Sequence, residues 1–504
     1  MSSQLSTYSL HRMSTGIAGL DVVLRGGLFR GGMYFVAGAP GTGKTTLANQ
    51  MCFAHVTGGG RAIYITLQTE HHSRMLAHLS GFSFFAPEHV GDALQYFSGT
   101  SAQQSGTARD FVQYVQRIIR DQRASLLVID GLENFKAHGG NGQLVKEALH
   151  ALHAYTESSG CTLILLGPAS PPPTNYEETI VDGVIYLRTD AVGLRTVRLL
   201  EVGKIRGSAF IPGKHIFVVG DDGITVYPRT EAVLATPSKP VAASHARLAF
   251  DIAGLDTMLQ GGVFAGSTTM LLGTPGSGKT ILGLHFLAAG SRLGEPALYF
   301  GLYETPDRLI AKADRVGLDF SAKKAAGQIE VEWISPVEGL LDFQVDRLLQ
   351  LVRRLRVRRL FLDGIDAFQH VMYPERIGQV LMALSNELRA QQVTTFLSAE
   401  LRQLVGPQVD LPIPIVSPIA ENILFLRSVE LGSTVQRLIS IVKIRDGGYD
   451  PTIREFVIGS QGIAIGSAIR NVDRMLTGTA RHVSVSSETS ASAGGGSSSV
   501  PPDA

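Results

Sequence analysis

One short pattern occurs twice in this chain and constrains its fold more than any other feature. A glycine, four free positions and then Gly-Lys-Thr make up residues 38–45, and the same pattern returns at residues 273–280. Such a stretch is a phosphate-binding loop. Its glycines let backbone N–H groups face one anion, its lysine reaches the β- and γ-phosphates, and its hydroxyl binds Mg²⁺. The sequence therefore predicts two nucleotide sites.

The residues around the first loop supply the context that phosphate binding requires. An apolar run at residues 33–37 predicts a buried strand before the loop, and residues 46–54 predict a helix after it. The N-terminus of that helix adds free N–H groups and a favourable dipole toward the phosphates. Further apolar strands end in Asp130 and, in the second half, in Asp363. Because ligands of open α/β sheets lie beyond the carboxyl ends of the strands, we expect both aspartates to hold the metal through water.

The predicted ligands of nucleotide and metal occupy equivalent positions in the two halves. The nucleotide-binding residues are expected in the last part of each loop, at Gly41, Thr42, Gly43, Lys44 and Thr45, and at Gly276, Ser277, Gly278, Lys279 and Thr280. The metal-binding residues are expected to be Thr45 and Asp130, and Thr280 and Asp363.

The second half of the chain repeats the first. Lys279 follows Lys44 by 235 residues, and Asp363 follows Asp130 by 233. Repetition at a nearly fixed period indicates two copies of one domain. We place the first domain at residues 1–230 and the second at residues 247–466. A linker rich in Pro, Ala, Ser and Thr is expected at residues 231–246, and a flexible tail at residues 467–504.

Composition limits the class of protein. The chain has 504 residues, 44% of them hydrophobic and 18% charged, which is typical of a globular protein of more than one domain. A formal net charge of +1 gives no general attraction to nucleic acid or to acidic membranes. The N-terminal residues lack the pattern of a signal peptide, and we find no apolar run of membrane-spanning length. We expect a cytoplasmic protein without a membrane partner.

Several motifs together resemble the KaiC family, the ATPases of the cyanobacterial circadian clock within the RecA superfamily. The resemblance rests on residues 15–21 and 26–28, the phosphate loop, the strand ending at Asp130 and the run at residues 204–207. It extends from about residue 10 to residue 466 and appears twice. It implies an α/β fold of two tandem RecA-like domains, each a mostly parallel sheet flanked by helices. It also implies that ATP and Mg²⁺ are the ligands. The assembly that it implies is a homo-oligomer, a hexameric double ring in which ATP lies between subunits.

The general base is the uncertain part of the predicted site. In the KaiC family, which this chain resembles, two adjacent glutamates follow the strand after the loop helix and activate the attacking water. The first half has Gln68-Thr69 there, with Glu70 one residue late, and the second has Tyr303-Glu304. A glutamine orients water but accepts no proton, so we expect slow hydrolysis in the first domain and Glu304 as the base in the second. A capping or solvent-facing role for Glu304 stays open.

Two further acidic residues could replace the missing glutamates. Glu133 and Asp366 each lie three residues after a metal aspartate. Helix capping explains both at least as well.

A pair of cationic residues lies in the last part of each repeat. Lys204 and Arg206, and likewise Lys443 and Arg445, alternate along a predicted strand and so point to one face. The resemblance implies that these four residues reach the nucleotide of a neighbouring subunit. Cations placed at the γ-phosphate stabilise the charge that develops in phosphoryl transfer. An ordinary solvated edge strand is the alternative.

Two remaining features bear on rival functions. The resembled family carries adjacent Ser-Thr phosphorylation sites in its second domain, and alignment places Ser417 there, followed by proline instead of threonine. Self-phosphorylation of Ser417 is therefore a weakened hypothesis beside a plain loop role. The arginine-rich run at residues 353–359 would suit nucleic acid. A solvated helix end before a buried strand explains it more simply.

Together these observations predict a KaiC-type ATPase that acts as a signalling or clock-like switch. An autokinase activity is an added hypothesis. We also expect protein partners, which the sequence does not identify. Two alternatives are kept. One is a DNA-handling ATPase of the RecA superfamily, which the neutral charge argues against. The other is a nucleotide-gated assembly scaffold with little turnover, which the missing glutamates favour.

Overall fold

The computed structural model defines most of the chain. The residues that it describes are 11–67, 72–99, 108–131, 142–169, 176–192, 195–240, 244–335, 340–370, 373–401, 419–431, 434–468, 472–473 and 481–482. Of the predicted features, residues 68–70, Glu133 and Ser417 lie outside these ranges, as does almost all of the predicted tail.

Contacts divide the chain into two compact units. The first spans residues 1–238 with 337–350 and 371–384, and the second spans residues 239–336, 351–370 and 385–504. The main division falls at residue 238, inside the stretch predicted as a linker. The predicted domain boundaries at residues 230 and 247 stay predictions.

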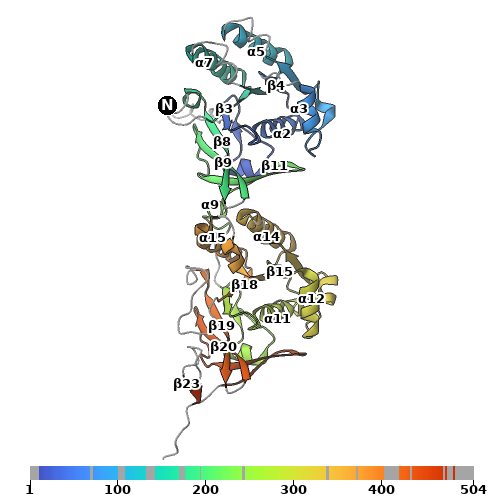
Figure 1. The fold of residues 1–504 in the computed structure, drawn as a ribbon, viewed down its shortest axis with the longest axis vertical. Coiled ribbons are helices and arrows are strands. Elements are labelled where there is room, and N and C mark those ends of the chain that lie inside the picture. The colour runs from blue at the N-terminus through green and yellow to red at the C-terminus, as the bar shows by residue number, and fades with distance from the viewer. Residues whose placement is uncertain are drawn as a thin grey trace, which may run out of the picture. The chain divides into compact units, whose positions relative to one another are not determined.

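A nine-stranded sheet forms the middle of the first unit (Figure 1). Its order is β11-β10-β9-β8-β3-β7-β6-β4-β5; neighbours from β8 to β5 are parallel, and β8 to β11 pair antiparallel. The strands are β3 (Met33–Gly38), β4 (Ala62–Thr66), β5 (Leu94–Ser98), β6 (Leu126–Asp130), β7 (Thr162–Gly167), β8 (Gly183–Val192), β9 (Arg195–Ile205), β10 (Lys214–Gly220) and β11 (Gly223–Tyr227).

Helices cover both faces of this sheet. Alternate residues of the central strands pack on α2 (Lys44–Thr57) on one face and on α5 (Ala108–Gln122) and α7 (Gly142–Ser159) on the other. In β3, for example, Tyr34 lies on the α2 face and Phe35 on the other. Burial on both faces explains why these strands read as continuous apolar runs instead of alternating ones.

The second unit repeats the sheet strand for strand. Its order, read in the same direction, is β22-β21-β20-β19-β14-β18-β17-β15-β16. The strands are β14 (Thr268–Gly273), β15 (Ala297–Gly301), β16 (Ile329–Trp333), β17 (Arg359–Asp363), β18 (Thr394–Glu400), β19 (Asn422–Leu431), β20 (Thr434–Ile444), β21 (Arg454–Gly459) and β22 (Gly462–Ala468). One face packs on α11 (Lys279–Arg292), the counterpart of α2.

Shorter elements complete the repeats. The remaining helices are α1 (Ala18–Val23), α3 (His72–Leu79), η1 (Pro87–His89), α8 (Tyr176–Ile180), α9 (Thr230–Val233), α10 (Ala253–Met258), α12 (Pro306–Arg315), α13 (Phe320–Ala325), α14 (Leu341–Leu355), η2 (Ile365–His370), η3 (Pro374–Arg376) and α15 (Ile377–Ala390). The remaining strands are β1 (Arg12–Met13), β2 (Leu28–Phe29), β12 (Arg247–Leu248), β13 (Val263–Phe264), β23 (Val472–Asp473) and β24 (Arg481–His482).

Even an irregularity recurs. The β8–β9 register shifts between Val184 and Ile185, so Gly203 has no partner across the ladder. The β19–β20 register shifts in the same way between Ile423 and Leu424, which leaves out Val442. A bulge at the same place in both copies locally re-aims the strand end that carries the paired cations.

The predicted fold class is confirmed. Two tandem units, each with a mostly parallel sheet flanked by helices, make a RecA-like α/β architecture. The helix predicted after the first loop is present as α2. Among the described residues, no helix combines the length and the apolar character that crossing a bilayer requires.

Candidate functional site

Each phosphate loop joins the end of a central strand to the start of a buried helix. In the first unit Gly41 and Gly43 have φ values of 78° and 102°, and α2 begins at Lys44. In the second, Gly276 and Gly278 have φ values of 71° and 101°. Residues with a Cβ rarely adopt such values, so glycine is required for the loop to curl. The predicted strand–loop–helix context is therefore present twice.

The loop lysines lie over the same two carbonyls in both copies. Lys44 Nζ donates to the carbonyl oxygens of Gly38 at 2.7 Å and Ala39 at 3.0 Å. Lys279 Nζ makes the equivalent bonds to residues 273 and 274, at 2.8 and 2.9 Å. Each ammonium therefore lies at the mouth of its loop, where a phosphate group would bind. Burial lowers the pKa of Lys279, and the nearby carboxylates of Glu400, Asp363 and Asp366 oppose that shift.

The hydroxyl and the aspartate predicted to hold the metal meet in both copies. Thr45 Oγ1 donates to Asp130 Oδ2 at 3.2 Å, and Thr280 Oγ1 donates to Asp363 Oδ2 at 2.9 Å. Both aspartates end their strands, as predicted. Burial raises the pKa of Asp363, and hydrogen bonds from Ser398, Thr280 and Tyr299 counteract that shift.

The donor set fits Mg²⁺ and a polyphosphate. Mg²⁺ prefers oxygen ligands and is commonly held by one or two protein groups together with phosphate and water. Here a hydroxyl and one carboxylate converge beside each loop. In the second loop, Thr274 Oγ1 and Ser277 Oγ are buried without a hydrogen-bond partner. Polar atoms left unpaired inside a loop are expected where a ligand supplies the partner.

A buried tyrosine donates to each aspartate that is predicted to hold the metal, and neither tyrosine was predicted from the sequence. Tyr64 donates its hydroxyl hydrogen to Asp130 Oδ2 at 2.6 Å, and Tyr299 donates to Asp363 Oδ2 at 3.0 Å. Burial and the negative charge of Asp363 raise the pKa of Tyr299 far above its ordinary value. A signal was available, because a tyrosine inside a fully buried strand needs a partner for its hydroxyl.

The second copy has one more donor at its aspartate. Ser398 Oγ donates to Asp363 Oδ1 and accepts from the backbone N–H of Gly364 at 2.8 Å. In the first copy the strand residue beside Asp130 is Leu166, whose side chain offers no hydrogen bond. The two sites therefore share a plan but differ in how the carboxylate is held.

The candidate base Glu304 is paired with a cation. Lys312 Nζ, on α12, donates to both carboxylate oxygens of Glu304, at 2.5 and 2.7 Å. Burial raises the pKa of Tyr299 most, and the charges of Asp363 and Glu304 add to that shift. A role for Glu304 as the base stays a prediction.

Asp366, the alternative acid, is held on both oxygens. Tyr303 donates to its Oδ2 at 2.7 Å, and the backbone N–H of Glu400 donates to its Oδ1 at 3.0 Å. Glu400 in turn lies 3.9 Å from the ammonium of Lys279. Asp366 thus fixes the end of β18 near the loop, which is a structural role that the sequence did not specify.

The cations of the first pair extend together toward the segment before β8, with Lys204 on β9 and Arg206 just after its end. Lys204 Nζ donates to the carbonyl of Glu178 at 2.5 Å, and Arg206 donates to those of Thr179 and Ile180 at 2.6 and 3.1 Å. In the second copy Lys443 Nζ donates to the carbonyl of Ala420 at 3.0 Å, and Arg445 is exposed.

Strand register places these cations far from the loop of their own unit. Lys204 lies opposite Val184, which is paired with Phe35 near the start of β3, whereas the loop follows Gly38 at its end. Arg206 lies further in the same direction, beside the residues that precede β8. Phe35 lies three strand residues before Gly38, roughly 10 Å, and the two further residues to Arg206 add roughly 7 Å. The pair therefore faces the edge of the sheet opposite to its own phosphate loop.

The arginine-rich run at residues 353–359 lies where it was predicted, but one of its arginines is buried instead of exposed to solvent. Helix α14 ends at Leu355 and β17 begins at Arg359, so the run does join a helix end to a buried strand. However, Arg359 is fully buried, with its Nε 2.6 Å from Glu295 Oε2 and its NH1 group donating to the carbonyl of Ala249 at 2.8 Å. The expectation of a solvated run is wrong for Arg359, because an internal ion pair and backbone acceptors compensate its burial.

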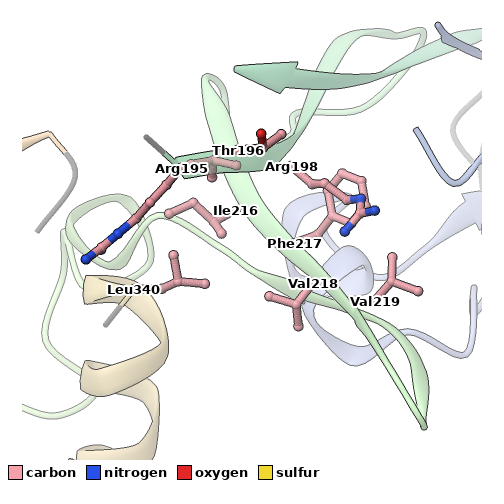
Figure 2. A pocket seen from close by; sticks show the side chains of 9 residues that line it. Arg195, Thr196, Arg198, Ile216, Phe217, Val218, Val219 and Leu340 are labelled. Carbon is pink, nitrogen blue, oxygen red and sulfur yellow. The ribbon is translucent and has the colours of Figure 1, made fainter. Parts of the chain in front are cut away.

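A hollow outside the candidate site lies on the antiparallel part of the first sheet (Figure 2). It has a volume of about 480 Å³ and is lined mainly by β9 and β10, including Arg195 and Arg198. No phosphate-loop residue lines it. Among the described residues, no group of three or more His, Cys, Asp or Glu is placed to hold a metal. The loops therefore remain the candidate site.

Comparison with known proteins agrees with this geometry. The family model for the ATPase KaiC matches residues 13–231 and again residues 249–469. A circadian clock oscillator protein KaiC of Picosynechococcus sp. is 26% identical over 493 residues, which cover 94% of this chain and 93% of the relative. One from Rippkaea orientalis is 25% identical, with 95% and 93% covered. A circadian clock protein KaiC3 of Synechocystis sp. is 24% identical, with 94% and 95% covered.

Proposed function

This chain belongs to the KaiC family of ATPases, and from that premise we propose that it binds Mg-ATP at both phosphate loops and hydrolyses it slowly, chiefly at the second. The observation that carries the proposal is the repeated convergence of a loop lysine, a hydroxyl and a strand-end aspartate. Thr45 with Asp130, and Thr280 with Asp363, are the groups that would hold Mg²⁺. Bound Mg²⁺ would neutralise charge on the phosphates and favour departure of the leaving group.

The chain's own residues divide the remaining work. The glycine-rich loops offer backbone N–H groups to the phosphates, and Lys44 and Lys279 supply positive charge at the γ-phosphate. Glu304 is the residue that we assign to accept the proton of the attacking water in the second unit. The charge of Glu304 acts on Tyr299, whose phenol donates to Asp363, and this supports the assignment.

We assign the paired cations to the nucleotide of a neighbouring copy. Lys204 and Arg206 lie at the sheet edge opposite to their own loop. A head-to-tail assembly would bring that edge to the neighbour's loop, and repetition of such a contact closes a ring. We propose a homo-oligomer with ATP between subunits, a hexamer by analogy with the family. Hydrolysis would then depend on assembly.

The biological output that we propose is a switch. The relatives named above are circadian clock proteins, and slow turnover coupled to assembly suits a timing or signalling device better than a motor. Self-phosphorylation at Ser417 is the finer form of this proposal. Mass spectrometry of Ser417 after incubation with Mg-ATP tests it, and an unmodified Ser417 in an active assembly would remove it.

A scaffold with little turnover is the second candidate. The ion pair between Glu304 and Lys312 favours this function, because the ammonium of Lys312 binds both oxygens of the carboxylate that would otherwise activate water. Phosphate release from Mg-ATP by the full chain separates the two functions. We expect slow release that Lys279→Ala abolishes at the second site. Nucleotide binding without release in the wild type would instead establish the scaffold.

A further inference from the structure

In both units a tyrosine hydroxyl is directed at the aspartate that would hold the metal. The bonds run to the same atom, from Tyr64 to Asp130 Oδ2 at 2.6 Å and from Tyr299 to Asp363 Oδ2 at 3.0 Å. The two tyrosines are 235 residues apart, which is the separation of Lys44 and Lys279. The contact therefore belongs to the repeated site and not to one copy alone.

The tyrosines are fixed in place by their surroundings. Tyr64 is 0% exposed and Tyr299 is 1% exposed. The ring of Tyr64 lies 5.6 Å from that of Tyr96, and the ring of Tyr299 meets that of Phe361 edge to face, also at 5.6 Å. Each tyrosine is on the strand next to the one that ends in the aspartate, with Tyr64 opposite Val128. A side chain this constrained holds its hydroxyl in one position.

The same carboxylate oxygen also accepts the hydroxyl of the metal-binding threonine. Thr45 donates to Asp130 Oδ2, and Thr280 donates to Asp363 Oδ2. A carboxylate oxygen has two acceptor directions. The phenol occupies one of them from inside the sheet, and the threonine hydroxyl occupies the other. The phenol is therefore joined through a single carboxylate oxygen to the threonine that is proposed to bind the metal.

We propose that Tyr64 and Tyr299 are positioning residues that orient Asp130 and Asp363 for Mg²⁺. This inference rests on the proposed function, because it concerns the metal of the same two sites. The phenol acts through the aspartate and contacts neither nucleotide nor metal. Its loss leaves the carboxylate able to rotate, so the metal is bound less tightly while the nucleotide contacts of the loop stay intact.

The test measures Mg²⁺-dependent binding of a fluorescent ATP analogue, N-methylanthraniloyl-ATP, to the full chain. Tyr299→Phe is studied in a Lys44→Ala background, so that the second unit alone reports. Magnesium is titrated from an EDTA-buffered start. A hydrogen bond to a charged group is strong enough that its removal should raise the half-saturating Mg²⁺ concentration about tenfold. Nucleotide affinity in EDTA should stay within about twofold, since the loop is untouched.

Tyr34→Phe is the matched control for Tyr64→Phe, because both tyrosines lie in the sheet of the first unit. Tyr34 is equally buried, but its hydroxyl accepts from the backbone N–H of Phe29 at 2.7 Å instead of donating to Asp130. A purely structural role for Tyr64 predicts that both variants behave alike. The proposal predicts a changed Mg²⁺ requirement for Tyr64→Phe and none for Tyr34→Phe, measured in the same Lys279→Ala background.

Ser398 provides a second, graded test. Because its hydroxyl also donates to Asp363, adding Ser398→Ala to Tyr299→Phe should raise the Mg²⁺ requirement further. The matching experiment in the first unit uses Tyr64→Phe in a Lys279→Ala background and should give the same direction.

The outcomes separate this inference from the proposed function. An unchanged Mg²⁺ requirement in Tyr299→Phe, beside a clear requirement in its parent, overturns the inference alone. A rise in Tyr34→Phe equal to that in Tyr64→Phe also overturns it. Nucleotide binding that is independent of Mg²⁺ in the wild type overturns the proposed function and this inference with it.

Discussion

The ammonium of Lys312 donates to both carboxylate oxygens of Glu304, at 2.5 and 2.7 Å. Both side chains are partly shielded from water, with 39% of Lys312 and 26% of Glu304 exposed. A carboxylate whose two oxygens both accept from an ammonium has fewer acceptor positions left for an attacking water. This pair therefore bears directly on how fast the second site would hydrolyse ATP.

Removing the carboxylate of Glu304 should slow hydrolysis far more than removing its partner. General-base catalysis contributes about 10²- to 10⁴-fold, so Glu304→Gln should lower kcat at the second site by about 100-fold or more. Lys312→Met keeps the length of the side chain but frees the carboxylate, and it should raise kcat by about two- to fivefold. Single-turnover phosphate release measures both, and wild-type kcat in Glu304→Gln would exclude Glu304 as the base.

The two loop lysines should differ in their importance for turnover. Residues 68 and 69, where the resembled family has its glutamates, are Gln and Thr, whereas the second copy keeps Glu304. Lys279→Ala should therefore lose most of the phosphate release and Lys44→Ala a smaller share. Size-exclusion chromatography of each variant controls for assembly. Equal losses in equally assembled variants would contradict this ranking of the sites.

Mixing two inactive variants should restore activity if the cations act on a neighbour's nucleotide. Lys279→Ala removes the loop cation and Arg445→Ala removes the exposed cation of the pair. In a mixed head-to-tail assembly, about one interface in four combines an intact loop with an intact Arg445. We expect about a quarter of wild-type phosphate release at the second site, from a mixture whose components release almost none. A mixture no more active than its components would show that Arg445 serves no neighbouring site.

Acid should weaken the second unit through His285. This histidine is 6% exposed on α11, and its Nε2 accepts from the backbone N–H of Ile463 at 3.1 Å. Burial, with a smaller contribution from the positive charge of Arg292, lowers its pKa from 6.5 to about 4. The unfolded chain then binds the proton more readily than the folded one. The stability contribution is full above pH 6.5 and is lost as the pH falls toward 4.

Urea unfolding at pH 7 and pH 5 measures this effect. The wild type should lose about 2 kcal/mol of the free energy of unfolding from His285 over that interval. His285→Gln keeps an acceptor for the backbone N–H of Ile463 but cannot take up a proton. Between pH 7 and pH 5 this variant should therefore lose about 2 kcal/mol less of its free energy of unfolding than the wild type. His78, which is exposed, supplies the control, and His78→Gln should keep the wild-type profile. Identical profiles for His285→Gln and the wild type would rule out His285 as the cause.

Much of the candidate site was predictable because most of its residues lie close together in the sequence, at a characteristic spacing. The loop glycines, Lys44 and Thr45 lie within eight consecutive residues, and a curled backbone at a helix N-terminus needs only these residue types in this order. Asp130 was predictable for a related reason, since a carboxylate at the end of an apolar strand falls on the ligand-binding edge of a parallel sheet. The repeat then located the second site without further information.

Contacts between strands were not predictable in this way. The hydroxyls of Tyr64 and Tyr299 reach their aspartates across neighbouring strands, which are 66 and 64 residues apart in sequence. The burial of Arg359 was missed for the same reason, because its compensating partners come from Glu295 and Ala249. Sequence spacing shows the alternation along one strand but not which strand lies beside it.

The sequence by itself determined two repeated domains, two phosphate loops, and the residue types that would hold nucleotide and metal; its resemblance to the KaiC family implied the RecA-like fold. Those features depend on local backbone geometry and on the pattern of apolar residues, which a single stretch of chain specifies. The tertiary structure decided that a buried phenol donates to Asp130 and to Asp363, and that the first pair of cations faces away from its own loop. Both depend on strand order and register, which arise only when distant segments pack together. The pairing of Lys312 with Glu304 joins residues only eight apart, but it depends on how α12 follows its strand.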